Sequence, residues 1–404
     1  MNIQTLKGFR DFLPKEARKR QYVLETLKKV FESYGFEPLE TPALEYEEIL
    51  TGKYGDEGDK LMYKFEDNGK RKVALRYDQT VPLARVVAEY QNDLPIPFKR
   101  YQIQNVWRAE NTQKGRYREL LHVDADIVGS YSLLSDVEII AVCARSLEKL
   151  GFKKFKILVN DRMLFTNLPN LGVTDKDIPI VVKAVDKLKK IGRQEVLAEL
   201  TRNGIPENKA NYLLETLENE KPTDRIKELI QALDKMGVDK GVVEFLPTLA
   251  RGLDYYTGLI FEVEVEGYDV GSIAGGGRYD NLIGMFANKD FPSVGFAFGF
   301  DRLIEAMEEL SLFPKSSSEN NLLVAYSASD LQEKAMKVTN ELREKGINVE
   351  FYLDDVTLEK QLKYADKKGL PFVLIINENK LVLKNMKSGK QEEVKLEEIK
   401  EKVS

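Results

Sequence analysis

Hydrophobic residues recur at helical spacing near the start of the chain, where we predict a helix from about Lys15 to Tyr34. The residues that fall on its apolar face are Val23, Leu27, Val30 and Tyr34. Pro14 suits the first turn of this helix, and Gly35 suits its end. The next segment, FEPLETPAL, contains two prolines, so an extended chain is predicted there instead of a second helix.

Strict alternation marks the segment RELLHVDADIV, between Arg118 and Val128. In an extended chain one side would carry Leu121, Val123, Ala125 and Ile127, and the other would carry His122, Asp124 and Asp126. Two interpretations remain open, because this polar side is either a face in contact with water or the floor of a ligand site. The preceding segment, RYQIQNVWR, also has apolar residues on one side and polar residues on the other, so the two segments predict a two-stranded ribbon. Its polar side would carry Gln102, Gln104 and Arg108.

The order of predicted elements divides the chain into parts. A second amphipathic helix is predicted from Ser135, a good capping residue, to Leu150. Charged helical repeats then predict a helical insertion, after which β patterns return. A polar segment, SSSEN, suits a linker, and alternating strands and helices beyond it predict a small α/β domain with parallel strands. The predicted boundaries are 1–165, 166–243, 244–315 and 320–404.

Composition narrows the class of protein. A length of 404 residues favours two or three domains. No run of about 18 apolar residues occurs, so a transmembrane helix is not expected, and the N-terminal segment does not resemble a secretory signal. The only cysteine, Cys143, cannot form an internal disulfide, which fits a cytoplasmic protein. A structural zinc site is not expected, because Cys143 and His122 are the only thiol and imidazole. The net charge of −5 still permits a local basic surface that binds nucleic acid.

Arginines form the first candidate for chemistry. Arg108, Arg116 and Arg118 would meet at the open end of the predicted ribbon. A guanidinium donates two parallel hydrogen bonds, which suits phosphate, although a surface basic cluster is an equally good interpretation of these three alone. Arg302 strengthens the phosphate hypothesis, because it lies in the first turn of a predicted helix, where free N–H groups favour anions. Arg251, before GLDYYTG, is a further candidate.

Glycines and the absence of common motifs limit the alternatives. AGGGRYD, from Ala274 to Asp280, has three successive glycines, which permit close approach of a backbone to a ligand or mark a turn or bulge. It is not a phosphate-binding Walker loop, because no Gly-Lys-Ser/Thr follows. With a single histidine and no nucleophile-elbow motif, a serine–histidine triad is not favoured.

Over essentially its whole length the sequence resembles the histidyl-tRNA synthetase family. FEPLETPAL, VWRAENTQKGRYRELLHVDADIVG and PSVGFAFGFDRL resemble motifs 1, 2 and 3 of class II aminoacyl-tRNA synthetases. ARGLDYYTGLIFE and AGGGRYD resemble two signatures specific to histidine and are the most specific matches. The resemblance implies an α+β fold: a class II antiparallel sheet flanked by helices, a helical insertion, and a C-terminal α/β anticodon-binding domain of about 85 residues.

The resemblance also implies roles for single residues on the ATP side. Arg108 would hold the α-phosphate, Arg116 would lie toward the γ-phosphate, and Glu110 would lie near adenine. Arg302 would hold the phosphates and stack on the base. Arg251 would reach the α-phosphate, as a catalytic residue together with Arg108. ATP would be a substrate, accompanied by Mg²⁺, and the sequence identifies no metal ligands.

For histidine, the resemblance implies contacts to the amino group and to the imidazole. Asp78 and Thr80 would bind the amino group, and the imidazole would be recognised by Asp126, Tyr256 and Tyr279. One position departs from the family, because His122 stands where a glutamine usually contacts the amino group. A neutral imidazole can accept a hydrogen bond from the ammonium, whereas a protonated one would repel it. Weaker histidine binding in acid, removed by His122→Gln, is therefore expected, unless His122 is merely tolerated near the site.

The resemblance implies histidine–tRNA ligase activity, with tRNA for histidine as partner, a homodimer built around motif 1, and no membrane. The main alternative is a synthetase-like regulatory subunit that binds histidine and partners an ATP phosphoribosyltransferase. Such relatives typically lack the Arg251 signature and the C-terminal domain, both of which this chain has. Glycyl, prolyl and threonyl enzymes share motifs 1 to 3 but not RGLDYYTG with AGGGRYD.

Overall fold

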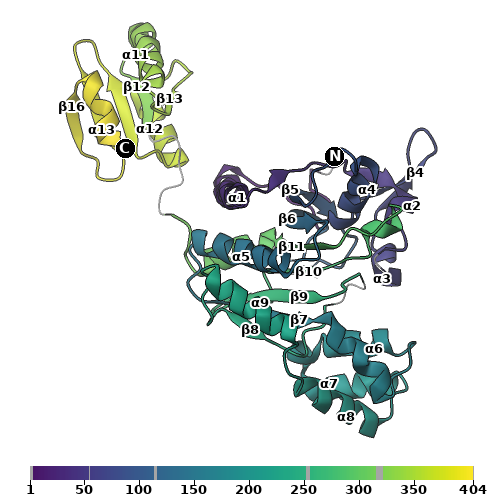
Figure 1. The fold of residues 1–404 in the computed structure, drawn as a ribbon. Coiled ribbons are helices and arrows are strands. Elements are labelled where there is room, and N and C mark those ends of the chain that lie inside the picture. Colours follow the sequence, from purple (N-terminus) through teal and green to yellow (C-terminus); the bar gives the residue numbers. More distant parts are fainter. Residues whose placement is uncertain (1–2, 54, 113–115, 252–254, 315–321, 404) are drawn as a thin grey trace. The chain divides into compact units, whose positions relative to one another are not determined.

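Strands with one apolar side build the larger part of the protein. The computed structural model describes residues 3–53, 55–112, 116–251, 255–314 and 322–403. Contacts divide the chain into two units, residues 1–313 and residues 314–404 (Figure 1). The first unit is built on an eight-stranded sheet, antiparallel except where β1 pairs with β5 and β7 pairs with β8. In spatial order its strands are β1 (Glu37–Pro38), β5 (Phe98–Trp107), β6 (Glu119–Val128), β11 (Ser293–Gly299), β10 (Ala274–Arg278), β9 (Leu259–Val265), β7 (Phe155–Asp161) and β8 (Val243–Phe245).

Helices cover the apolar face of this sheet. The predicted alternation in β6 is confirmed, because Val123, Ala125 and Ile127 are buried in the main core. The helices that supply the other side of that core are α1 (Pro14–Ser33), α5 (Leu133–Lys149), α9 (Asp224–Lys235) and α10 (Phe300–Glu309). Helix α5 is capped by Ser132, whose side chain accepts a hydrogen bond from the Leu134 N–H, so the prediction of Ser135 as the cap was wrong.

A three-stranded sheet with its own helices follows motif 1. It includes helix α4, which begins at Thr80 and was not predicted from the sequence. Pro82 is compatible with this helix because it lies in the first turn, where its missing N–H costs no hydrogen bond. The elements of this layer are β2 (Leu44–Tyr46), β4 (Lys72–Leu75), β3 (Lys64–Glu66), α2 (Glu47–Leu50), α3 (Gly55–Lys60), α4 (Thr80–Tyr90) and the short 3₁₀ helix η2 (Ile283–Met285).

Helices fill the chain between β7 and β8, and the first of them begins at Arg162, four residues before the predicted helical insertion. Most of them form a separate apolar cluster, which packs against Leu158 of β7 and Ile260 of β9. The members of this cluster are η1 (Arg162–Leu171), α6 (Ile178–Val185), α7 (Leu188–Arg202) and α8 (Glu207–Glu218). Helix α9 differs, because its apolar residues join the main core beside α5.

The second unit is a five-stranded sheet with helices. The three strands that the sequence predicted, β12, β13 and β14, are parallel, and two further strands, β15 and β16, extend the sheet in antiparallel fashion. Its elements are β12 (Leu322–Tyr326), η3 (Ser329–Leu331), α11 (Gln332–Glu344), β13 (Val349–Phe351), α12 (Leu358–Lys368), β14 (Phe372–Ile376), β15 (Leu381–Asn385), β16 (Gln391–Val394), η4 (Leu396–Glu398) and α13 (Ile399–Val403). The predicted linker at 316–320 lies outside the described residues. Within the described ranges, no helix is long and apolar enough to cross a membrane.

Candidate active site

A cavity of about 420 Å³ opens on the polar face of the large sheet. Its walls come from the connection between β4 and α4, the β5–β6 ribbon, strands β9, β10 and β11, and the start of α10. Unlike Arg118, all eleven side chains to which the family resemblance assigned a role line this one cavity: Asp78, Thr80, Arg108, Glu110, Arg116, His122, Asp126, Arg251, Tyr256, Tyr279 and Arg302. The polar side of β6 is therefore the floor of a cavity rather than a face in open water.

Arg108 leaves the end of β5 and is held by its neighbours in a fixed orientation. Its Nε donates a hydrogen bond to the Tyr77 carbonyl oxygen over 3.1 Å, and its guanidinium lies 4.5 Å from the centre of the Tyr77 ring. An Nη atom lies 3.5 Å from Nε2 of His122 on β6. Arg108 and His122 are therefore neighbours in the cavity wall.

The connection between β5 and β6 carries Glu110 and Arg116. An Nη atom of Arg116 lies 3.7 Å from a carboxylate oxygen of Glu110, and the two side chains are partly exposed. Arg118 is turned toward the same place, because its Nε donates to the Glu110 carbonyl oxygen over 3.2 Å. The three arginines of motif 2 thus gather at the open end of the ribbon, as predicted. Residues 113–115 of the connection lie outside the described residues.

Arg251 packs against strands β9 and β10. Its Nη1 donates to a carboxylate oxygen of Glu262 over 2.8 Å, and its backbone has a φ of 52°, in the left-handed region. Gly275 leaves the space for its guanidinium, since a Cβ there would lie 2.0 Å from Nη1 of Arg251. The glycine run therefore permits the close approach of a side chain. Residues 252–254, which complete the RGLDYYTG motif, lie outside the described residues.

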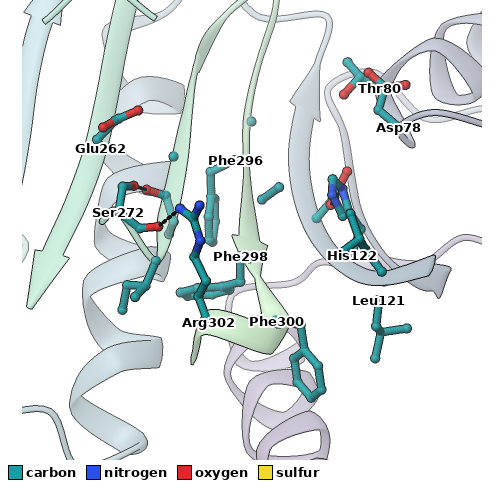
Figure 2. A pocket seen from close by; sticks show the side chains of 18 of the residues that line it. Asp78, Thr80, Leu121, His122, Glu262, Ser272, Phe296, Phe298, Phe300 and Arg302 are labelled. Carbon is teal, nitrogen blue, oxygen red and sulfur yellow. Dashed lines mark hydrogen bonds and ion pairs between the residues drawn. The ribbon is translucent and has the colours of Figure 1, made fainter. Parts of the chain in front are cut away.

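Arg302 lies in the first turn of α10, as expected. Its Nη1 donates to the Ser272 carbonyl oxygen over 3.0 Å, and this bond holds the guanidinium beside Ser272 (Figure 2). In the same view, Asp78, Thr80 and His122 lie on the opposite side of the cavity from Arg302 and Glu262. The cavity therefore has one end with Arg302 and Glu262 and another with acidic, hydroxyl and imidazole groups, where Arg108 lies beside His122.

Asp126 is the acidic centre of that second end. It is buried, Tyr279 donates a hydrogen bond to its Oδ1, and the fully buried Arg100 forms an ion pair with its Oδ2 at 2.8 Å. Burial raises the pKa of Asp126 to about 6, and the charge of Arg100 opposes that rise. Burial also raises the pKa of Tyr279 well above its ordinary value, so the phenol keeps its proton and remains a donor. Gly295 provides the room, since a Cβ there would lie 1.8 Å from Oδ1 of Asp126.

The start of α4 supplies the remaining polar groups. Oδ1 of Asp78 accepts a hydrogen bond from the Val81 N–H over 3.1 Å, which fixes the carboxylate at the N-terminus of α4. Thr80 is the first residue of α4. The ring of Tyr256 packs 4.9 Å from that of Tyr255, centre to centre, which gives this side of the cavity an aromatic wall.

Several residues at this site were not predicted. Arg100 and Glu262 pair with Asp126 and Arg251, while Tyr77 and Tyr255 support the rings and guanidiniums around them. Arg100 and Glu262 lie on strands at alternating positions, but the strand order that brings each to its partner is not visible in sequence. Among the residues that the structure describes, no group of three or more His, Cys, Asp or Glu side chains could hold a metal ion.

Comparisons with known proteins agree with this site. The model of the histidyl-tRNA synthetase family matches residues 8–303, and that of an anticodon binding domain matches residues 318–404. The histidine–tRNA ligases of Cytophaga hutchinsonii and Christiangramia forsetii are 40% and 39% identical and match over 97% and 95% of each chain. The crystal structure of histidyl-tRNA synthetase from Nostoc sp. PCC 7120 is 31% identical, with a TM-score of 0.86 over all of both chains.

A largely antiparallel sheet with arginines over one face and helices behind the other defines the catalytic domain of a class II aminoacyl-tRNA synthetase. The family match covers nearly three quarters of the chain and includes the whole cavity. The chain belongs to the histidyl-tRNA synthetase family. A protein from Bacillus halodurans C described as an ATP phosphoribosyltransferase regulatory subunit/histidyl-tRNA synthetase has the same fold, with a TM-score of 0.76 at 22% identity.

Proposed function

We propose that this chain joins histidine to its tRNA in two steps, using ATP. The observation that carries the proposal is the arrangement of one cavity, with Arg251 and Arg302 at one end, Asp126 with Tyr279 at the other, and Arg108 beside His122. The first end suits a triphosphate, because guanidiniums bind phosphate through paired hydrogen bonds. The second end suits an imidazole, which needs a hydrogen-bond partner for each ring nitrogen.

Histidine would lie with its ring toward Asp126 and its amino group toward α4. The Asp126 carboxylate would accept the N–H of the ring, with Tyr256 and Tyr279 at the other polar edges. Asp78 and Thr80 would bind the ammonium group, together with His122 in its neutral form. Amino acids with apolar side chains would place an apolar group against the buried Asp126 carboxylate and supply no N–H to it, and this penalty makes the site selective.

ATP would occupy the arginine end. Arg108 and Arg251 would bind the α-phosphate, with Arg116 toward the γ-phosphate. Glu110 would lie near adenine, and Arg302 would hold the phosphates and stack on the base. We propose that Mg²⁺ enters as part of the ATP substrate, bound to its phosphate oxygens.

The first step forms a bond between a carboxylate oxygen of histidine and the α-phosphorus. The bond from that phosphorus to the bridging oxygen breaks, and pyrophosphate leaves. Two anions must approach each other, so guanidiniums already fixed by Tyr77 and Glu262 lower the barrier without having to reorganise. In the second step a hydroxyl at the 3′ end of the tRNA attacks the carbonyl carbon of the adenylate, and AMP leaves.

Further parts of the proposal concern the partners. Residues 320–404 would bind the anticodon region of the tRNA for histidine. The chain would act as a homodimer in the cytoplasm. The alternative is a histidine-binding regulatory subunit, and His122 is the one feature of the site that favours it. Such subunits typically lack the Arg251 signature, whereas this chain has Arg251 and the Glu262 side chain that holds it.

Pyrophosphate exchange into ATP, measured with each amino acid in turn, tests the function. Exchange should depend on histidine, and its absence with histidine or a faster rate with another amino acid would contradict the proposal. Arg251→Ala should lower the exchange rate by roughly 10²–10³, the usual loss when one donor to a developing charge is removed. Arg145→Ala, on the exposed side of α5, is the matched control. A loss below about fivefold for Arg251→Ala would make this residue structural rather than catalytic.

A further inference from the structure

The N-terminal segment of residues 8–12 contacts the ATP end of the cavity from outside. The Arg118 N–H donates to the Gly8 carbonyl oxygen over 2.9 Å, which ties the segment to the β5–β6 connection. Gly8 has a φ of 90°, and a Cβ there would lie 2.7 Å from Cγ of Arg118. The close approach therefore requires glycine.

Arg10 in this segment joins two cavity residues that are far apart in sequence. Its guanidinium carbon lies 3.2 Å from the centre of the Tyr117 ring, a stacking distance. Its Nη2 lies 2.8 Å from Oδ1 of Asp301. Both Tyr117 and Asp301 line the cavity. Tyr117 directly follows Arg116 and Asp301 directly precedes Arg302, so Arg10 contacts the neighbours of two arginines that line the cavity.

The ion pair with Asp301 lies in a protected place. Asp301 is 6% exposed, and the same Oδ1 receives a second guanidinium, that of Arg20 on α1, at 2.8 Å. Arg20 also lies 3.9 Å from the centre of the Phe12 ring, which anchors the segment to α1. Because the carboxylate is shielded from water, its ion pairs are screened less than surface pairs, and they restrain the start of α10.

We propose that Arg10 is a positioning residue for ATP, which holds Tyr117 and Asp301 so that Arg116 and Arg302 are already placed before the nucleotide binds. This inference rests on the proposed function, in which those two arginines bind ATP. The entropy lost in ordering these two long side chains is then lost on folding, so it does not weaken the binding of ATP. The histidine end of the cavity has no contact with Arg10 among the interactions described, so its affinity should be independent of this residue.

Histidine-dependent pyrophosphate exchange separates the two substrates. Arg10→Ala should raise the KM for ATP about tenfold, equal to about 1.4 kcal/mol, while the KM for histidine stays within about twofold. Arg10→Lys keeps a cation near Asp301 but loses the planar stack on Tyr117, so it should give an intermediate KM for ATP. Lys15→Ala, which removes an exposed charge from the first turn of α1, is the matched control and should match the wild type.

A double variant tests whether Arg10 acts through Tyr117. The effects of Arg10→Ala and Tyr117→Leu on the KM for ATP should be less than additive, because either change breaks the same contact. Equal increases in both KM values, or an unchanged KM for ATP, would overturn the inference. If Arg10→Ala does not fold, Arg10→Lys and Tyr117→Leu decide by the same criteria. Equilibrium titration with ATP gives the same comparison without catalysis, so an inactive wild type would contradict the proposed function and still leave this inference decidable.

Discussion

Asp126 is the residue whose ionisation the proposed histidine site depends on most. Burial raises its pKa to about 6, the positive charge of Arg100 lowers it, and the negative charge of Asp124 raises it again. The Tyr279 hydrogen bond favours the charged form, and the more distant Asp78 disfavours it. Because the pKa is raised, the acceptor form of the carboxylate is complete only above about pH 7 and is lost as the pH falls through about 6.

The KM for histidine should therefore rise in acid. If only ionised Asp126 binds the ring, the KM increases by about tenfold for each pH unit below about 6, because the ionised fraction falls at that rate. Exchange kinetics between about pH 8 and pH 5 measure the effect. A histidine analogue with an azole ring that stays neutral at pH 5 removes the titration of the substrate from the comparison.

His122→Gln then divides the effect between two groups. The sequence assigned acid sensitivity to His122 alone, and that contribution stays a prediction. Because Asp126 also titrates in this range, we now expect the glutamine variant to keep part of the rise in KM with the neutral-ring analogue. A flat profile in this variant would show that His122 alone is responsible, and a flat profile in the wild type would exclude both groups.

The polar side of β6 shows how far sequence alone reaches at single positions. A period of two was enough to place His122, Asp124 and Asp126 on one side of a strand, and the structure places all three in the cavity. The partner of Asp126 could not be predicted in the same way. Arg100 meets Asp126 because β5 and β6 pair in a register that sets these two residues opposite each other, and register depends on the whole ribbon.

The glycines of β10 make different contacts, although they are consecutive. A Cβ on Gly275 would lie 2.0 Å from Nη1 of Arg251, the far end of a long side chain, and 3.2 Å from the Phe261 carbonyl oxygen. A Cβ on Gly276 would lie 2.1 Å from the Gly295 carbonyl oxygen, part of the backbone of β11. The first conflict can be relieved by moving a guanidinium, whereas the second requires a shift of the sheet.

Alanine at these two positions should therefore give opposite results. Gly275→Ala should displace Arg251 and lower the exchange rate by roughly 10²–10³, with a small change in the free energy of unfolding. Gly276→Ala should lower the free energy of unfolding by about 1–3 kcal/mol or more, as overpacking of a core does. Urea titration followed by circular dichroism, together with exchange kinetics, measures both. Equal destabilisation by the two variants would contradict this division of roles.

Helices with regular apolar faces were predictable, and elements without such a pattern were not. Helix α1 lies within one residue of its prediction at each end, because four apolar residues at helical spacing define it. Helix α4 was missed because Pro82 is a strong local signal against a helix, while its position in the first turn becomes known only with the structure. Strand β16 was missed because its two consecutive glutamates interrupt any alternation, as is common for a strand at a sheet edge. Strand β15 was missed because it begins with three successive apolar residues and so shows no alternation.

An exposed apolar surface supports the proposed homodimer. Leu44 and Tyr46 lie on the same side of β2, and Phe65 of β3 shares that side, because Tyr46 and Phe65 both pair with Val73. These three large side chains are 42%, 52% and 47% exposed in the single chain. Apolar groups gathered on one side of a small sheet favour an interface, and motif 1, which resembles the dimerisation motif of class II enzymes, leads directly into this sheet.

The mass of the protein in solution tests this assembly. Light scattering should give twice the mass of the chain for the wild type, and Tyr46→Asp should shift the protein toward a single chain. A carboxylate in the middle of an apolar interface would lose its water, a cost of several kcal/mol that each copy bears. Tyr212→Asp is the matched control, because Tyr212 is similarly exposed, at 56%, but lies on α8, among the helices between β7 and β8. A wild type with the mass of one chain would refute the dimer, whereas a Tyr46→Asp variant that keeps twice that mass would move the interface away from β2.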